Sequence, residues 1–120
     1  MEYFKISLPN SLVRINPLDI VYIKAEGNYS TIVLTNGTSR TFTFQLIALE
    51  KASKQLLNNP LMRVGRSYLV NKHYIYVVDL TEQILVFAGR EITAKIPNLS
   101  ISRDSLKQLK QELEREKLQA

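Results

Sequence analysis

A short loop in the middle of the chain, Gly65-Arg66-Ser67, combines a freely turning backbone with a planar cation. Glycine lets the backbone turn sharply or approach a partner closely. The guanidinium of Arg66 carries a fork of donors that fits phosphate oxygens or the edge of a guanine base. The pattern favours contact with nucleic acid. The alternative is that Arg66 is a surface arginine stacked on Tyr68.

Two further loops carry polar side chains of the same kind. In Glu26-Gly27-Asn28-Tyr29-Ser30, Asn28 and Ser30 are hydrogen-bond formers, since asparagine pairs with an adenine edge and serine with phosphate or base. The alternative is an ordinary turn that needs glycine and asparagine for its conformation. In Ser102-Arg103-Asp104, Arg103 is a second reading residue, an exposed residue of a first helical turn, or the salt-bridge partner of the aspartate that follows it.

The composition argues against catalysis. The chain has no cysteine, and no orienting carboxylate or nucleophile is suggested for its single histidine, His73. The four glycines are far apart, so neither nucleotide-binding glycine pattern is present. We therefore expect no enzyme, no cofactor and no metal site. Without a signal-peptide pattern or an apolar run of roughly 20 residues, we also expect a cytoplasmic protein with no membrane partner.

The charge favours an anionic partner. Sixteen Lys and Arg against eleven Asp and Glu give a formal net charge of +5, which suits nucleic acid but also suits solubility alone. Between residues 51 and 103 there are eight basic residues and three acidic ones. Four basic residues are secondary candidates for phosphate contact, on charge and position alone: Lys24, Arg63, Lys72 and Lys95.

Most of the sequence predicts short strands separated by turns. Asn36-Gly37 is the strongest hairpin signal, because both residues tolerate the positive φ of a tight primed turn. Apolar spacing predicts a helix over Gln45–Leu57, ended by Asn58-Asn59-Pro60, and a second helix from Asp104 with Ser102 as its N-cap. The expected strands are Tyr3–Leu8, Leu12–Ile15, Ile20–Lys24, Tyr29–Leu34, Arg40–Phe44, Leu61–Val64, Tyr68–Val70, Tyr74–Asp79, Ile84–Phe87 and Glu91–Ile96.

These elements predict one mainly β domain over residues 1–120, with a core of about residues 3–103 and a C-terminal helix of about residues 104–118. The leucines of that helix, Leu106, Leu109 and Leu113, pack either on their own sheet or against a second copy of the chain. Packing on the sheet is favoured, because three leucines make only a short coiled-coil seam.

Taken together, these segments resemble the LytTR DNA-binding domain of bacterial transcriptional regulators, from about residue 3 to about residue 113. The matching segments are Asp19-Ile20-Val21-Tyr22-Ile23-Lys24-Ala25-Glu26-Gly27-Asn28-Tyr29-Ser30, the Asn36-Gly37 hairpin, the Leu46–Leu57 helix, Arg63-Val64-Gly65-Arg66-Ser67-Tyr68-Leu69-Val70-Asn71, and Ile101-Ser102-Arg103 before the leucine-spaced helix.

The resemblance implies a fold of packed antiparallel sheets whose loops, rather than a recognition helix, enter successive major grooves of double-stranded DNA. The family's base and phosphate contacts correspond here to Asn28, Tyr29, Ser30, Arg66 and Arg103. It also implies an operator with repeated half-sites, and hence a homodimer on DNA. The alternative is a β-rich protein-interaction or regulatory module that keeps the fold without reading DNA.

This sequence departs from the family pattern in three respects. Gly65 stands where the family usually has histidine, and the segment 94–99 looks longer than usual. A typical family member also carries a receiver domain, as a response regulator does, or membrane segments. Neither occurs here, so the sequence identifies no regulatory input.

Overall fold

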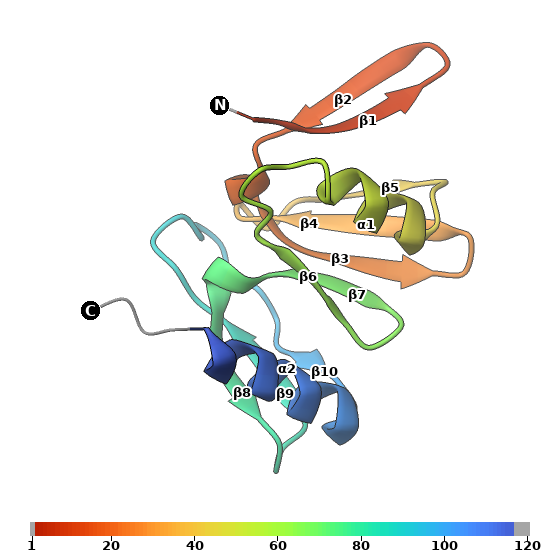
Figure 1. Cartoon of the computed structure of the whole chain (residues 1–120). Helices are drawn as coiled ribbons and strands as arrows, with labels where there is room; N and C mark the ends of the chain where they lie inside the picture. The colour runs from red at the N-terminus through yellow and green to blue at the C-terminus, as the bar shows by residue number, and fades with distance from the viewer. Residues whose placement is uncertain (1, 117–120) are drawn as a thin grey trace.

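The computed structural model describes residues 2–116, and within them strands outnumber helices (Figure 1). The strands are β1 (Phe4–Leu8), β2 (Ser11–Ile15), β3 (Ile20–Glu26), β4 (Tyr29–Leu34), β5 (Ser39–Phe42), β6 (Leu61–Val64), β7 (Tyr68–Asn71), β8 (Ile75–Asp79), β9 (Ile84–Phe87) and β10 (Leu99–Ser100). The helices are α1 (Leu46–Ser53) and α2 (Arg103–Arg115), with 3-10 turns at Pro17–Asp19 and Lys72–Tyr74. This confirms the mainly β prediction with one internal and one C-terminal helix.

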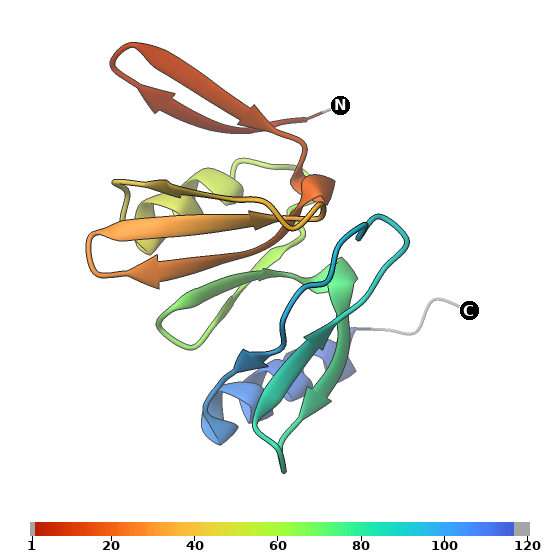
Figure 2. The ribbon, with the colours of Figure 1, turned by 180° about the vertical axis from the view of Figure 1, so that it is seen from behind.

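The strands of the described region form three antiparallel sheets: the hairpin β1-β2, the central sheet β5-β4-β3-β7-β6, and the sheet β10-β9-β8. The hairpin and α1 cover one face of the central sheet, while α2 and the sheet β10-β9-β8 lie on its other side (Figures 1 and 2). The central sheet therefore separates two hydrophobic cores.

The middle strand of the central sheet, β3, and its neighbour β7 are buried on both faces. Ile23 and Leu69 belong to the core under α1, whereas Val21 and Val70 belong to the core under α2. A bulge between Ile20 and Tyr22 turns two successive residues of β3 toward the second core. These strands consequently read as nearly continuous apolar runs rather than as an alternating pattern.

Each helix contributes a narrow apolar stripe to the core that it covers. Leu46 and Leu49 of α1 are buried in the first core, and Leu106 and Leu109 of α2 are buried in the second, with Leu113 packed beside them. The leucines of α2 thus pack on their own sheet, as favoured from the sequence.

A buried amide ties β7 to the start of β3. The side chain of Asn71 has no exposed surface, and its Nδ2 donates to the carbonyl oxygens of Pro17 (3.2 Å) and Ile20 (2.9 Å). Its Oδ1 accepts from the backbone N–H of His73 at 2.9 Å, which caps the following 3-10 turn. One side chain thus satisfies three backbone groups from two segments.

The prediction of a strand at Glu91–Ile96 is wrong, because this segment is irregular in the structure. Ile92 N–H donates to Gly89 in a turn, and Thr93 N–H donates to Thr35 at the end of β4, so this backbone is bonded to other segments. The strand partner of β9 on this side is the short β10, after Pro97. Side chains of Ile92 and Ile96 still reach the second core, which explains the strand-like apolar spacing.

The end of α1 and the conformation of one turn also differ from the sequence prediction. α1 ends at Ser53 rather than Leu57, because Gln55 and Leu56 form i→i−3 turns and Leu57 is exposed. The Asn36-Gly37 hairpin exists, but positive φ occurs only at the glycine; Asn36 instead accepts from Thr38 N–H through its side chain. The predicted end of α2, at residues 117–118, lies outside the described residues.

Replacing Asn71 should destabilise the fold without touching the surface. Asn71→Ala removes two donors and one acceptor from buried partners and leaves a cavity, so we expect the free energy of unfolding to fall by at least about 2 kcal/mol. Urea unfolding measures this. Asn98→Ala, at an exposed loop position, is the control. Equal stability of the two variants would contradict the role given to Asn71.

The buried phenol of Tyr74 should make stability fall at high pH. Its hydroxyl donates to the carbonyl of Leu18, and burial, reinforced by Glu91 and Asp19, raises the pKa of Tyr74 above its ordinary value. The stabilisation is complete below about pH 10, the pKa in the unfolded chain, and is lost as the pH rises further.

Tyr74→Phe should therefore have a free energy of unfolding about 0.5–1.5 kcal/mol lower than the wild type at neutral pH. As the pH rises above about 10, its free energy of unfolding should fall less than that of the wild type. Unfolding curves at each pH measure this. Tyr76→Phe, at an exposed position of β8, is the control. A Tyr74→Phe profile parallel to the wild type would refute the effect.

Candidate nucleic-acid interface

Three polar connections lie at the same end of the central sheet. Because its strands are antiparallel, the β3–β4 turn, the β5–α1 connection and the β6–β7 loop all emerge together. In Figure 1 the β3–β4 turn, the β6–β7 loop and the first residues of α2 follow one another along the right side of the molecule. In Figure 2, seen from behind, they lie on the left side. We call this end of the molecule the loop edge.

The β3–β4 turn presents Asn28 and Tyr29. Glu26 pairs with Tyr29 across a two-residue turn in which Gly27 has a φ of +63°, as the first central residue of a tight primed hairpin turn requires. The Asn28 side chain is exposed, and its Oδ1 lies 3.5 Å from Nε2 of Gln45, at the end of the β5–α1 connection. The Tyr29 side chain is 51% exposed. Both side chains are thus available to a partner.

Ser30, unlike Asn28 and Tyr29, is not exposed in this structure. Its side chain is fully buried, and its hydroxyl donates to the carbonyl oxygen of Phe44 at 2.6 Å. The bond joins the start of β4 to the β5–α1 connection, which carries Gln45. Ser30 therefore links two of the three connections at the loop edge from beneath their exposed side chains.

The β6–β7 loop presents Arg66. Val64 pairs with Tyr68 across Gly65-Arg66-Ser67, and Gly65 has a φ of +60°. The carbonyl of Ser67 accepts from the N–H of Ala25 at 2.7 Å, which places this loop beside the end of β3.

The Arg66 side chain is exposed. Among residues 2–116 it has no side-chain hydrogen bond, ion pair or aromatic ring beneath it. The alternative of stacking on Tyr68 is therefore not found; the Tyr68 ring instead contacts Tyr22 edge-on, with centroids 6.1 Å apart.

The start of α2 abuts the same loop. Ser102 caps the helix by accepting from Ser105 N–H at 3.3 Å. A Cβ added at Gly65 would lie 3.0 Å from the Ser105 hydroxyl, so loop and helix are in close contact. Arg103 is exposed, and within the described part of the chain it forms no ion pair with Asp104 or any other carboxylate. The guanidinium groups of Arg66 and Arg103 are thus both free of internal partners there.

The four secondary phosphate candidates occupy different environments. Lys24 is on β3 close to the loop edge, with Nζ 3.8 Å from Glu26. The Arg63 guanidinium donates hydrogen bonds to other groups of the protein, including the Glu50 carboxylate. Lys72 pairs with Glu116 at 3.0 Å after the far end of β7, and Lys95 follows residues that touch the β4–β5 turn. The last two lie away from the loop edge.

Sequence reasoning missed Gln45 as part of the site. The sequence prediction begins the helix at Gln45, whereas α1 begins at Leu46 and Gln45 reaches Asn28 from the loop edge. One signal in the sequence could have placed Gln45 outside the helix. Gln45 stands between the end of a predicted strand and the start of a helix that has no Ser, Thr, Asp or Asn as its N-cap.

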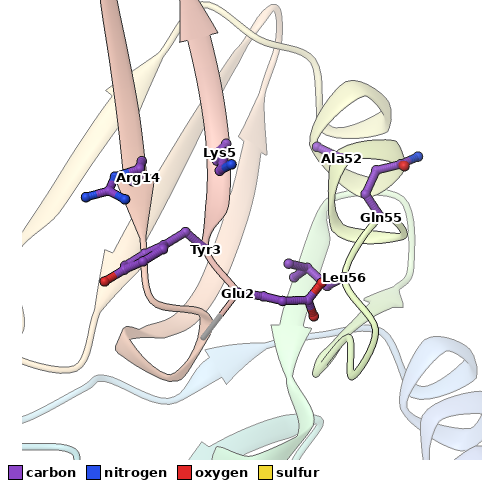
Figure 3. Close-up of a pocket in the computed structure, with 7 residues that line it drawn as sticks. All are labelled: Glu2, Tyr3, Lys5, Arg14, Ala52, Gln55 and Leu56. Atoms are coloured by element: carbon purple, nitrogen blue, oxygen red, sulfur yellow. The ribbon is translucent and has the colours of Figure 1, made fainter.

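A separate groove lies between the β1–β2 hairpin and α1 (Figure 3). On the hairpin side the Arg14 guanidinium sits 4.4 Å from the centroid of the Tyr3 ring, and Lys5 is its cross-strand neighbour. Glu2 closes one end, since its carboxylate accepts from Leu57 N–H at 2.7 Å. The hairpin is held on the α1 side of the molecule by this bond and by Phe4 and Ile6, which belong to the same core as Leu46 and Leu49 of α1.

Other kinds of site are not found in the part of the chain that the structure describes. No helix there is long and apolar enough to cross a membrane. No three His, Cys, Asp or Glu side chains there gather as metal ligands would.

Comparison with known proteins identifies the family of the chain. A family model, the LytTr DNA-binding domain, matches residues 10–114. The fold also matches a solved LytTr DNA-binding domain from Bacillus cereus, described as that of a putative methyl-accepting/DNA response regulator, with a TM-score of 0.62 and 14% identity over 94% of this chain and 97% of that one. No curated protein matches.

At that identity the structural match shows the shared fold, while the family model identifies the kind of protein. The chain is a DNA-binding module and not an enzyme. It belongs to the LytTR family of DNA-binding domains, as its motifs suggested, and this implies DNA binding as a transcriptional regulator.

Ser30→Ala tests the structural role of that hydroxyl. Its loss leaves the Phe44 carbonyl without a buried donor, so we expect the free energy of unfolding to fall by about 1–3 kcal/mol. DNA affinity, measured well below the unfolding transition, should stay within about twofold of the wild type. Ser39→Ala, at an exposed position of β5, is the control. Unchanged stability with weakened DNA binding would restore Ser30 as a contact.

Proposed function

We propose that this domain reads double-stranded DNA in a sequence-specific manner through the loop edge, with the loops entering the major groove. The observation that carries the proposal is the exposure of Arg66 and Arg103 on adjoining segments, each guanidinium being free of internal partners among the described residues. Unpaired arginines lose no ion pair when they meet a phosphate or a guanine.

Each exposed group has a chemical role in this proposal. Arg66 donates two hydrogen bonds to a guanine edge, and Asn28 pairs with an adenine edge. Tyr29 lies against the backbone or a base from the same turn as Asn28. Arg103 contacts base or phosphate from the first turn of α2, where the positive end of the helix adds to its charge. Lys24 is positioned near the same edge for a phosphate.

The biological setting follows from the family. We propose a bacterial transcriptional regulator that acts in the cytoplasm and binds an operator with repeated half-sites as a homodimer on DNA. Repeated half-sites would place two loop edges on one side of the duplex when their spacing is near a helical turn.

The alternative is a protein-interaction module that keeps this fold without reading DNA. Gly65 favours it, because the family usually has histidine at that position. A salt titration distinguishes the two. A DNA-binding domain loses affinity steeply as salt rises, whereas an interaction module binds DNA weakly at every salt concentration.

Arg66→Ala tests the proposal directly, after the operator has been selected from a pool of random duplexes. We expect a loss of about 1–3 kcal/mol in binding free energy and relaxed preference at one base pair, because Arg66 reads a base edge. Mobility-shift titrations against the operator and its single-base variants measure both effects.

Lys95→Gln is the matched control, since it also removes one cation but away from the loop edge. It should leave operator affinity and salt slope unchanged. Unaltered affinity in Arg66→Ala would overturn the base-reading role. A flatter salt slope in Lys95→Gln would instead support the phosphate contact expected there from sequence.

A further inference from the structure

We infer that Arg63 is a positioning residue and not a phosphate contact. Its guanidinium, held by Glu50 of α1, fixes the conformation of the loop that carries Arg66. The inference rests on the proposed function for its effect on DNA reading. The arrangement itself is visible without DNA.

Each of the three guanidinium nitrogens of Arg63 donates to a different acceptor. Nε reaches the carbonyl oxygen of Gly65 at 3.2 Å, and Nη2 reaches the carbonyl oxygen of Arg66 at 2.9 Å. Nη1 forms an ion pair with Oε1 of Glu50 at 2.9 Å. The fork therefore links the loop to a helical residue that is 13 positions away in sequence from Arg63.

These contacts fix the direction in which the loop presents its side chain. Two successive peptide carbonyls of a three-residue loop are held on the side of Arg63, which restricts the backbone of Arg66 on both sides of its Cα. The loop is also braced by the Ser67–Ala25 hydrogen bond and by Ser105. Arg66 is thus presented from a loop held by several segments, as base reading requires.

The environment of Arg63 argues against a phosphate role. The side chains of Arg63 and Glu50 are 33% and 23% exposed, so the pair is partly shielded from water. Engaging a phosphate would break charge-assisted bonds that already use the guanidinium fork. Lysine cannot replace it, because an ammonium lacks the planar fork that spans three acceptors.

Glu50→Gln gives the sharpest test. If Glu50 were only a negative charge near the DNA, Glu50→Gln would tighten binding to every sequence. If Glu50 is part of the brace, Glu50→Gln should lower the ratio of operator to non-operator affinity by about three- to tenfold, because Arg66 is presented less accurately. Glu26→Gln is the matched control: it removes an exposed acid near the same edge that pairs with Lys24, and should keep the ratio unchanged.

Arg63→Lys separates the fork from the charge. We expect it to lower the affinity ratio as Glu50→Gln does, with the salt slope unchanged. If Arg63 instead contacts phosphate, Arg63→Lys should keep that contact and the wild-type affinity ratio. Arg63→Gln should then weaken binding to all DNA sequences alike and reduce the slope of log affinity against log salt by about 1. That pair of results would overturn the inference.

NMR order parameters of the amides of residues 65–67 test the brace in the free protein. Glu50→Gln and Arg63→Lys should both lower them, while Glu26→Gln should not. Unchanged order parameters overturn the inference whatever the DNA result. Lowered order parameters in a protein that binds no DNA would support the brace and refute the proposed function, so the two failures are distinguishable.

Discussion

The burial of β3 and β7 on both faces is the constraint on which the rest of this structure depends. Val21 and Val70 point into one core while Ile23 and Leu69 point into the other. A slip of either strand by one residue would exchange the two sets, and both cores would lose their packing at once. The bulge in β3 and the buried Asn71 amide fix the register at the start of the strand pair. The positions of the turns at the other end follow.

At that other end, the arginines divide into two kinds. Arg63 has a carboxylate partner, whereas Arg66 and Arg103 have none among the described residues. The difference has a physical logic. An arginine that shapes a loop must be occupied by the protein, while one that meets an external anion must be left with its donors free. Net charge counts all three alike, and the contacts distinguish them.

Much of this could be predicted from the sequence, because it depends on local chemistry. The hairpins at Gly27 and Gly37, the strand pair around Gly65 and the leucine stripe of α2 each have signals within a few residues. The loop edge could be anticipated in part, because antiparallel strands bring their turns together.

What sequence could not provide depends on distant partners. Ser30 looks like any loop serine until Phe44 is found beneath it, and Arg63 looks like a free cation until Glu50 is found beside it. The segment 91–96 has strand-like spacing, yet its backbone bonds go to the end of β4 and to its own turn. The positions of Lys72 and Lys95 away from the loop edge likewise depend on how distant segments are arranged. For Ser30, Arg63 and the segment 91–96, a tertiary contact decides what a local signal could not.

The braced loop also bears on how such a domain diversifies. Asn28, Arg66 and Arg103 are exposed on a frame whose stability comes from other residues, so a substitution at one of them costs folding little. Under the proposed function, new operators are then reachable by single mutations. Residues 50 and 63, by contrast, form an ion pair, and under the inferred brace we expect them to covary among descendants of this chain.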